Sequence, residues 1–205
     1  RFLFILFIGG FTSGFSQKPD LRFNHISTMD GLSHNFVRNI VQDYKGFMWF
    51  ATADGLNRYD GYRIKSYKNE IGNNKSLTHN DVWLLFENSK KELLIGTRFG
   101  LDVYNRDQDN FFKDPVIGER NVSCITEDND KNVWICAWGE LFFFDKTINK
   151  FKKYECEGLM SDISQLTIDS KNNFWLNSKV NGLFLIDKVN RKLIPQTALD
   201  AKQVN

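Results

Sequence analysis

Short apolar runs alternate with short polar segments along the chain, and this arrangement recurs four times. Short runs bounded by polar turn residues are typical of β-strands rather than helices. In every copy, a Val or Ile opens one apolar run and a Trp or Leu follows twelve residues later in the next run. These pairs are Val37 and Trp49, Val82 and Leu94, Val122 and Trp134, and Ile163 and Trp175.

Other positions repeat in the same phase. A residue with a carboxylate or amide side chain lies six positions after each opening Val or Ile: Asp43, Asn88, Asp128 and Asp169. Such residues favour turns between strands. A Gly-Leu pair follows in three copies, and the third copy has Glu140-Leu141 instead. Each copy therefore predicts four short strands, and the copies start 45, 40 and 41 residues apart, which is the period of a propeller blade.

Two apolar positions three residues apart mark the start of each predicted inner strand, as in Val37 and Ile40. Because side chains alternate along a strand, we predict that the two point to opposite faces. A strand that is apolar on both faces lies between two other sheets, which blades packed around an axis provide. We therefore assign these positions, and the Trp or Leu of the second strand, to the structural core: Val37, Ile40, Trp49, Val82, Leu85, Leu94, Val122, Ile125, Trp134, Ile163, Leu166 and Trp175.

The predicted fold is an all-β propeller built from four-stranded antiparallel blades. We place a partial propeller over residues 21–205, with blades at about 36–68, 81–113, 121–155 and 162–195. A lone outer strand is expected at 22–27, and a fifth copy begins near the end of the chain. Four blades can close a ring, but these two ends indicate about four blades of a larger propeller, with an exposed blade face.

The N-terminal segment differs from the repeats. Arg1 precedes an apolar stretch from Phe2 to Phe11, and small residues follow, with Gly14 and Ser16 placed as before a cleavage site. About ten apolar residues are too few to span a bilayer, which needs roughly 20. We interpret residues 1–16 as a signal peptide with a truncated start and expect an exported, periplasmic protein; the alternative is a buried N-terminal strand.

The composition argues against some classes of function. The 205 residues are 41% hydrophobic and 25% charged with a net charge of +2, and no basic run is long enough to indicate a nucleic-acid partner. The three cysteines, Cys124, Cys136 and Cys156, lack metal-binding spacing. Cys124 and Cys136 fall in neighbouring predicted strands and could pair across a hairpin, but we favour small buried hydrophobic residues.

No catalytic constellation, cofactor motif or metal site is predicted, because the repeated carboxylates occupy equivalent turn positions and the three histidines are scattered.

The loops, unlike the strands, differ in sequence between the copies. In a propeller, the loop entering the inner strand and the loop between the second and third strands lie at one end. Candidate ligand-binding residues there are His34, Asn35, Arg38, His79, Asn80, Trp83, Arg98, Trp138 and Lys179. Aromatic faces with amide and cationic donors suit a carbohydrate, and ordinary polar loops are the alternative.

A longer motif runs from Leu32 to Gly61: L-S-H-N-x-V-R-x-I-x-x-D-x-x-G-x-x-W-x-x-T-x-D-G-L-x-R-Y-D-G. It resembles the first repeat of the two-component regulator propeller family, the periplasmic sensor region of hybrid two-component systems. The resemblance covers the chain after residue 20, although Leu94 and Glu140 depart from the family pattern.

The resemblance implies a paired seven-bladed sensor that binds an extracellular oligosaccharide and regulates carbohydrate-utilisation genes. An immunoglobulin-like domain, a membrane helix anchoring the protein in the inner membrane, a histidine kinase, a receiver and a helix-turn-helix activator would follow. The expected protein partners are the remaining blades of the propeller and a second copy of the same protein in a homodimer. Two alternatives stay open: a secreted scaffold propeller without a kinase, and a fragment of a propeller lyase or hydrolase.

Overall fold

The structure, a computed structural model, describes residues 23–158 and 162–196. The predicted signal peptide over residues 1–16 lies outside the described residues. Four antiparallel sheets of four strands each form the predicted blades, and the strands follow one another in sequence order within every sheet. No helix in the described ranges is long and apolar enough to cross a bilayer.

The strand bounds repeat from blade to blade. Blade 1 contains β1 (Val37–Gln42), β2 (Met48–Thr52), β3 (Gly55–Tyr59) and β4 (Ile64–Tyr67); blade 2 contains β5 (Val82–Glu87), β6 (Leu93–Thr97), β7 (Gly100–Asn105) and β8 (Asn110–Lys113); blade 3 contains β9 (Val122–Glu127), β10 (Val133–Ala137), β11 (Glu140–Asp145) and β12 (Lys150–Lys153); blade 4 contains β13 (Ile163–Ile168), β14 (Phe174–Ser178), β15 (Gly182–Asp187) and β16 (Lys192–Pro195).

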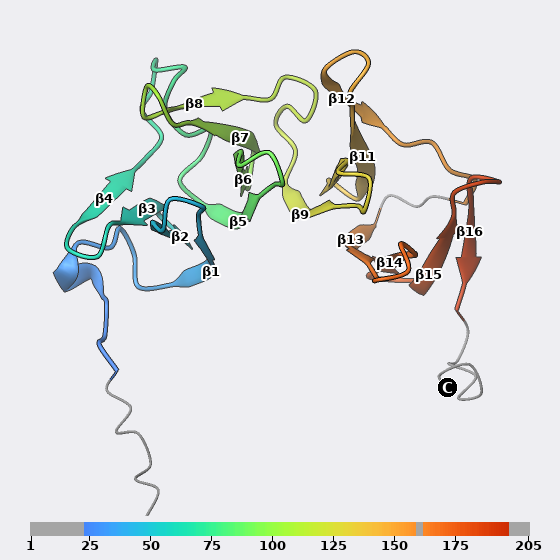
Figure 1. The fold of residues 1–205 in the computed structure, drawn as a ribbon, viewed down its shortest axis with the longest axis horizontal. Coiled ribbons are helices and arrows are strands. Elements are labelled where there is room, and N and C mark those ends of the chain that lie inside the picture. The colour runs from blue at the N-terminus through green and yellow to red at the C-terminus, as the bar shows by residue number, and fades with distance from the viewer. Residues whose placement is uncertain (1–22, 159–161, 197–205) are drawn as a thin grey trace, which may run out of the picture.

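The blades form an open arc, with blade 1 and blade 4 at its two ends (Figure 1). The inner strands contact one another in order, β1 with β5, β5 with β9 and β9 with β13. Three apolar clusters fill the spaces between successive blades. The hydrophobic core is therefore divided into three interfaces, and each is made by two neighbouring sheets.

A β-bulge in every inner strand changes which side chains share a face. In β1, Val37 lies opposite Thr52 and Asn39 lies opposite Ala51, so Arg38 is the extra residue. The register shifts at the same place in the other three blades. In blade 2, Val82 and Leu85 consequently pack into the same cluster, against blade 1. The prediction that the two apolar positions point to opposite faces was therefore wrong, because the bulge absorbs one residue of the alternation.

The inner strands are nevertheless apolar on both faces. Leu84 and Phe86 of β5 pack into the cluster shared with blade 3, opposite the face that carries Val82 and Leu85. The residues between the repeated positions thus supply the second face. This arrangement explains why the inner strand needs a nearly continuous apolar run rather than strict alternation.

The repeated carboxylates bind the repeated tryptophans. The indole Nε1 of Trp49 donates to Asp43 at 2.9 Å, that of Trp134 to Asp128 at 2.9 Å, and that of Trp175 to Asp169 at 3.0 Å. A buried indole N–H needs an acceptor, and a carboxylate six residues earlier supplies it. Blade 2 has Leu94 in place of Trp, and Asn88 in place of Asp. Blade 2 therefore lacks both the indole donor and the carboxylate acceptor of this hydrogen bond.

Core positions at the ends of the arc are less buried than those between blades. Ile40 was predicted to be core, but 52% of its surface is exposed, whereas the equivalent Leu85 is 5% exposed. Trp175 is half-buried, whereas Trp49 is fully buried. Ile40 faces away from blade 2 and Trp175 faces away from blade 3, so no described blade covers either side chain.

The outer strand expected at 22–27 is absent from its described part, because residues 23–27 are not in a strand. Such a strand needs the edge of another blade for its backbone hydrogen bonds, and none lies on that side of blade 1. The following residues fold onto blade 1 instead, beginning with a short 3-10 helix, η1 (Thr28–Asp30). Leu32 is buried, and the backbone N–H of Ser33 donates to Asn57 Oδ1 at 2.9 Å.

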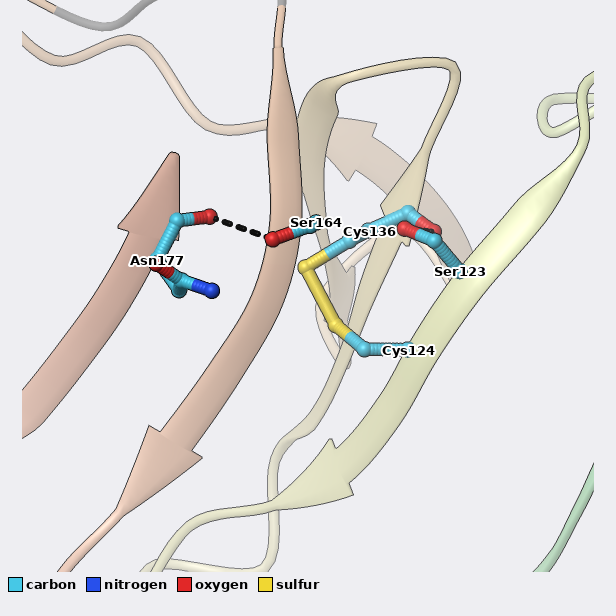
Figure 2. Close-up of a disulfide and its surroundings, with 5 residues drawn as sticks. All are labelled: Ser123, Cys124, Cys136, Ser164 and Asn177. Carbon is cyan, nitrogen blue, oxygen red and sulfur yellow. Dashed lines mark hydrogen bonds between the residues drawn. A yellow bond between two sulfur atoms is a disulfide. The ribbon is translucent and has the colours of Figure 1, made fainter. Parts of the chain in front are cut away.

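A disulfide joins Cys124 of β9 to Cys136 of β10 (Figure 2). The two cysteines are opposite each other in the strand register and are buried against blade 4. The favoured prediction of unpaired cysteines was wrong for this pair, since antiparallel pairing brings the two Cα atoms to 4.9 Å, within the range that a disulfide spans. Cys156 is free.

Candidate functional site

Both loop classes that carry the predicted ligand-binding residues lie at one end of the blades. In each blade, the turn between the second and third strands donates a backbone hydrogen bond to the residue just before the inner strand. The bonded pairs are Ala53 with Phe36, Arg98 with Asp81, Trp138 with Asn121, and Lys179 with Asp162. We refer to this end as the loop end.

A hollow of about 320 Å³ opens at the loop end across blades 2, 3 and 4. Three of the predicted residues, Trp83, Trp138 and Lys179, line it together. They come from three different blades and are separated by 55 and 41 residues in the sequence. Its remaining lining residues are Asn121, Ser123, Gly139, Asp162 and Ile163.

Trp138 has an unusual backbone conformation. It lies in the two-residue turn between β10 and β11 with φ 53°, and Gly139 beside it has φ 76°. Positive φ at both positions suits a tight hairpin turn, but a large side chain there is strained. The Trp138 side chain is also 71% exposed. An exposed aromatic ring held in a strained turn at the edge of a hollow is typical of a contact surface.

Two of the residues that line the hollow, Trp83 and Asp162, each have a buried polar atom without a protein partner. Trp83 Nε1 and Asp162 Oδ1 are buried and make no hydrogen bond among the described residues. The other oxygen of Asp162 accepts from the Ser178 hydroxyl and from the backbone N–H of Val180. The Ser178 bond is the main cause of a lowered pKa at Asp162. Asp162 is therefore a carboxylate at neutral pH, and its Oδ1 has an unused capacity to accept a hydrogen bond.

Arg38 extends this surface toward blade 1. Its guanidinium lies 4.9 Å from the centre of the Trp83 ring and forms an ion pair with Asp81 at 2.8 Å. Asp81 also fixes the local backbone, because its N–H donates to His79 Nδ1 at 2.9 Å. The Trp83 ring thus contacts a cation and also lines the hollow.

The other predicted residues are placed differently. Asn35 accepts from the backbone N–H of Thr28, and Asn80 accepts from that of Asn69, so both side chains fix loop conformation. His34 accepts from the N–H two residues later, as His79 does. Arg98 is exposed beside Phe99 and does not line the hollow.

Sequence reasoning missed the three lining residues with polar side chains other than Lys179: Asn121, Ser123 and Asp162. Asn121 and Asp162 are the residues immediately before the inner strands of blades 3 and 4, equivalent to Asp81 in blade 2. Ser123 occupies the bulge position equivalent to Arg38 and Trp83. The repeat phase could have identified all three, because equivalent positions in neighbouring blades lie side by side.

A family model described as "Two component regulator propeller" matches residues 31–54 and 117–139. These two segments of the chain are thus similar to two component regulator propeller repeats. The first match covers the start of blade 1 and the second extends through β9 and β10 of blade 3.

Several known proteins are similar to this chain in sequence or in fold. Histidine kinase P4 of Formosa agariphila is 36% identical over 63 residues, which is 31% of this chain and 5% of that kinase. Two extracellular domains of hybrid two component systems from B. thetaiotaomicron have a similar fold. BT3049 matches with a TM-score of 0.74 at 23% identity over 85% of this chain and 26% of its own; BT4673 gives 0.67 at 20% identity over 92% and 24%. The chain thus spans about a quarter of either domain.

Proposed function

We propose that this chain is part of an extracellular sensor of a hybrid two-component system and that it binds an oligosaccharide in the hollow at the loop end. The observation that carries the proposal is the convergence of Trp83 and Trp138 with an unpaired donor and an unpaired acceptor. Sugar rings have apolar faces and hydroxyl rims, so one ligand can use both features.

The charges of the hollow favour a particular orientation of the sugar. Lys179 offers a cation, and Asp162 offers a carboxylate whose Oδ1 is unpaired. The carboxylate accepts from a neutral hydroxyl, whereas Lys179 suits an acidic substituent or a further hydroxyl. Because Asp162 is held by Ser178 and Val180, its position is fixed before the ligand binds, which lowers the entropic cost of binding.

Signalling follows from contacts with more than one blade. A saccharide that touches blades 2, 3 and 4 favours one arrangement of these blades, and it shifts the sensor population only as far as it binds that arrangement more tightly. Further blades, a second copy of the sensor and a membrane-anchored kinase are the partners that this function requires. The resemblance to extracellular domains supports a periplasmic location.

The test is a screen of neutral and acidic oligosaccharides followed by titration calorimetry. Alanine at both Trp83 and Trp138 is expected to weaken binding of the best ligand roughly tenfold or more, because both stacking surfaces are removed. Tyr62→Ala is a matched control, since Tyr62 is 94% exposed in the β3–β4 turn, away from the hollow. Unchanged affinity in the double variant would remove the hollow as the binding site.

A further inference from the structure

The interface between blades 2 and 3 lacks an aromatic pair that the other two interfaces contain. At the interface of blades 1 and 2, Trp49 stacks on Tyr67 with ring centres 5.8 Å apart. At the interface of blades 3 and 4, Trp134 packs edge-to-face on Tyr154 at 5.1 Å. In both interfaces, the Trp and the Tyr come from the earlier of the two blades.

Blade 2 has smaller side chains at both positions. Leu94 replaces the Trp. Asp114 replaces the Tyr, because its N–H bonds to the carbonyl of Leu101 as that of Tyr154 bonds to Leu141. Asp114 instead accepts from the backbone N–H groups of Val116 and Ile117, each at 2.9 Å. Its side chain therefore fixes the following turn and does not fill the space that the Tyr ring fills in the other interfaces.

The aromatic side chains of the later blade are retained. Tyr104 and Phe111 of blade 2 face Trp49 and Tyr67, and the Trp49 ring centre lies 4.8 Å from that of Tyr104. The equivalent residues of blade 3 are Phe144 and Phe151, whose rings are 5.2 Å apart. One half of the aromatic interface therefore remains in place without the rings that it would contact.

A cavity of about 100 Å³ lies at this place. Leu94, Val103, Val133, Phe144 and Phe151 form its apolar walls, and seven polar or charged residues, among them Asp114, Lys90 and Glu92, also line it. It lies toward the ends of the blades opposite the loop end, because it includes residues of the β5–β6 and β9–β10 turns. Purely apolar cavities of this order can bind an aromatic molecule, and here the five apolar side chains supply the walls that an aromatic ring would contact.

We propose that this cavity is a second binding site, which takes a small molecule with a single aromatic ring. The ring occupies the place of the missing Trp side chain and packs on Phe144 as Trp49 packs on Tyr104. The site is separate from the hollow at the loop end, and its ligand class follows from the residues that the interface lacks. It therefore does not depend on the proposed sensor function.

Benzene is the probe for this site. We expect saturable binding that raises the Tm of the chain and shifts the methyl resonances of Val103 and Val133. The double variant Leu94→Trp with Asn88→Asp restores the indole and its acceptor found in the other three blades. This variant fills the cavity from within, so both benzene effects should disappear.

Leu94→Phe is a second filling variant, with a smaller change in volume, in case the double variant does not fold. Loss of benzene binding in whichever filled variant folds supports the site. Absence of saturable binding to the unmodified chain overturns the proposal. Equal binding to the unmodified chain and to a folded filled variant also overturns it, because benzene would then bind elsewhere.

Discussion

At the scale of single residues, equivalent positions show how one substitution changes the chemistry of a repeat. Asn57 and Asp102 both follow the Leu of a Gly-Leu pair and are fully buried. Asn57 accepts from the N–H of Ser33 and donates to its hydroxyl at 2.8 Å. Asp102 accepts from both the N–H and the hydroxyl of Thr78, at 2.8 and 2.6 Å. The Asn57 amide thus makes both hydrogen bonds without carrying a charge. The Asp102 carboxyl group, in contrast, is either charged or protonated inside the core.

This difference predicts a pH effect. Burial raises the pKa of Asp102 to about 6 from its ordinary 3.8, although the Thr78 bonds lower it. Its contribution to stability is therefore full below pH 3.8 and is lost as the pH rises toward and past 6. Asp102→Asn removes this dependence, and its stability relative to the unmodified chain should rise by up to about 3 kcal/mol between pH 4 and pH 7. Urea unfolding across this range measures it; a constant difference would contradict it.

At the scale of elements, the β9–β10 hairpin combines a bulge with a covalent link. Cys124 follows the bulged Ser123 directly, and its partner Cys136 lies opposite it on β10. In blade 4, the equivalent Ser164 donates to the carbonyl of Asn177 at 3.0 Å, as Ser123 does to Cys136 at 3.3 Å (Figure 2). The bulge is thus held by a hydroxyl in both hairpins, and only blade 3 adds the disulfide.

The disulfide can be tested by labelling thiols. Alkylation without reductant should modify one cysteine, Cys156, and alkylation after reduction in denaturant should modify all three. The link closes a short loop, so alanine at both Cys124 and Cys136 is expected to cost roughly 3 kcal/mol of unfolding free energy. Cys156→Ala is the control and should change stability little. Three labelled thiols before reduction would show that the hairpin is not linked.

At the scale of the whole molecule, the burial of a repeat position depends on whether a neighbouring blade covers it. Ile40 and Leu85 occupy the same place in blades 1 and 2, yet only Leu85 lies between two sheets. Trp49 and Trp175 show the same contrast at the other side of the blade. The open faces of blades 1 and 4 are the surfaces against which the further blades of the proposed sensor would pack.

The two equivalent aliphatic residues predict unequal costs. Leu85→Ala should lower the free energy of unfolding by about 2–5 kcal/mol, because it leaves a cavity between blades 1 and 2. Ile40→Ala should cost less than about 1 kcal/mol, because half of this side chain is already in water. Chemical denaturation of both variants makes the comparison. Equal costs would mean that another surface covers the face of blade 1 in solution.

The sequence by itself determined the repeat, the strands and their turns, since these depend on residues within one blade; it placed the Asp at the turns, and only the structure showed that each Asp accepts from the Trp indole. It also selected Trp83, Trp138 and Lys179 as loop-end candidates. Only the tertiary structure decided that these three line one hollow, that Asn35 and Asn80 fix loops, that Cys124 and Cys136 join, and that Ile40 is exposed. Those outcomes depend on strand register and on neighbouring blades, which bring together residues far apart in the chain.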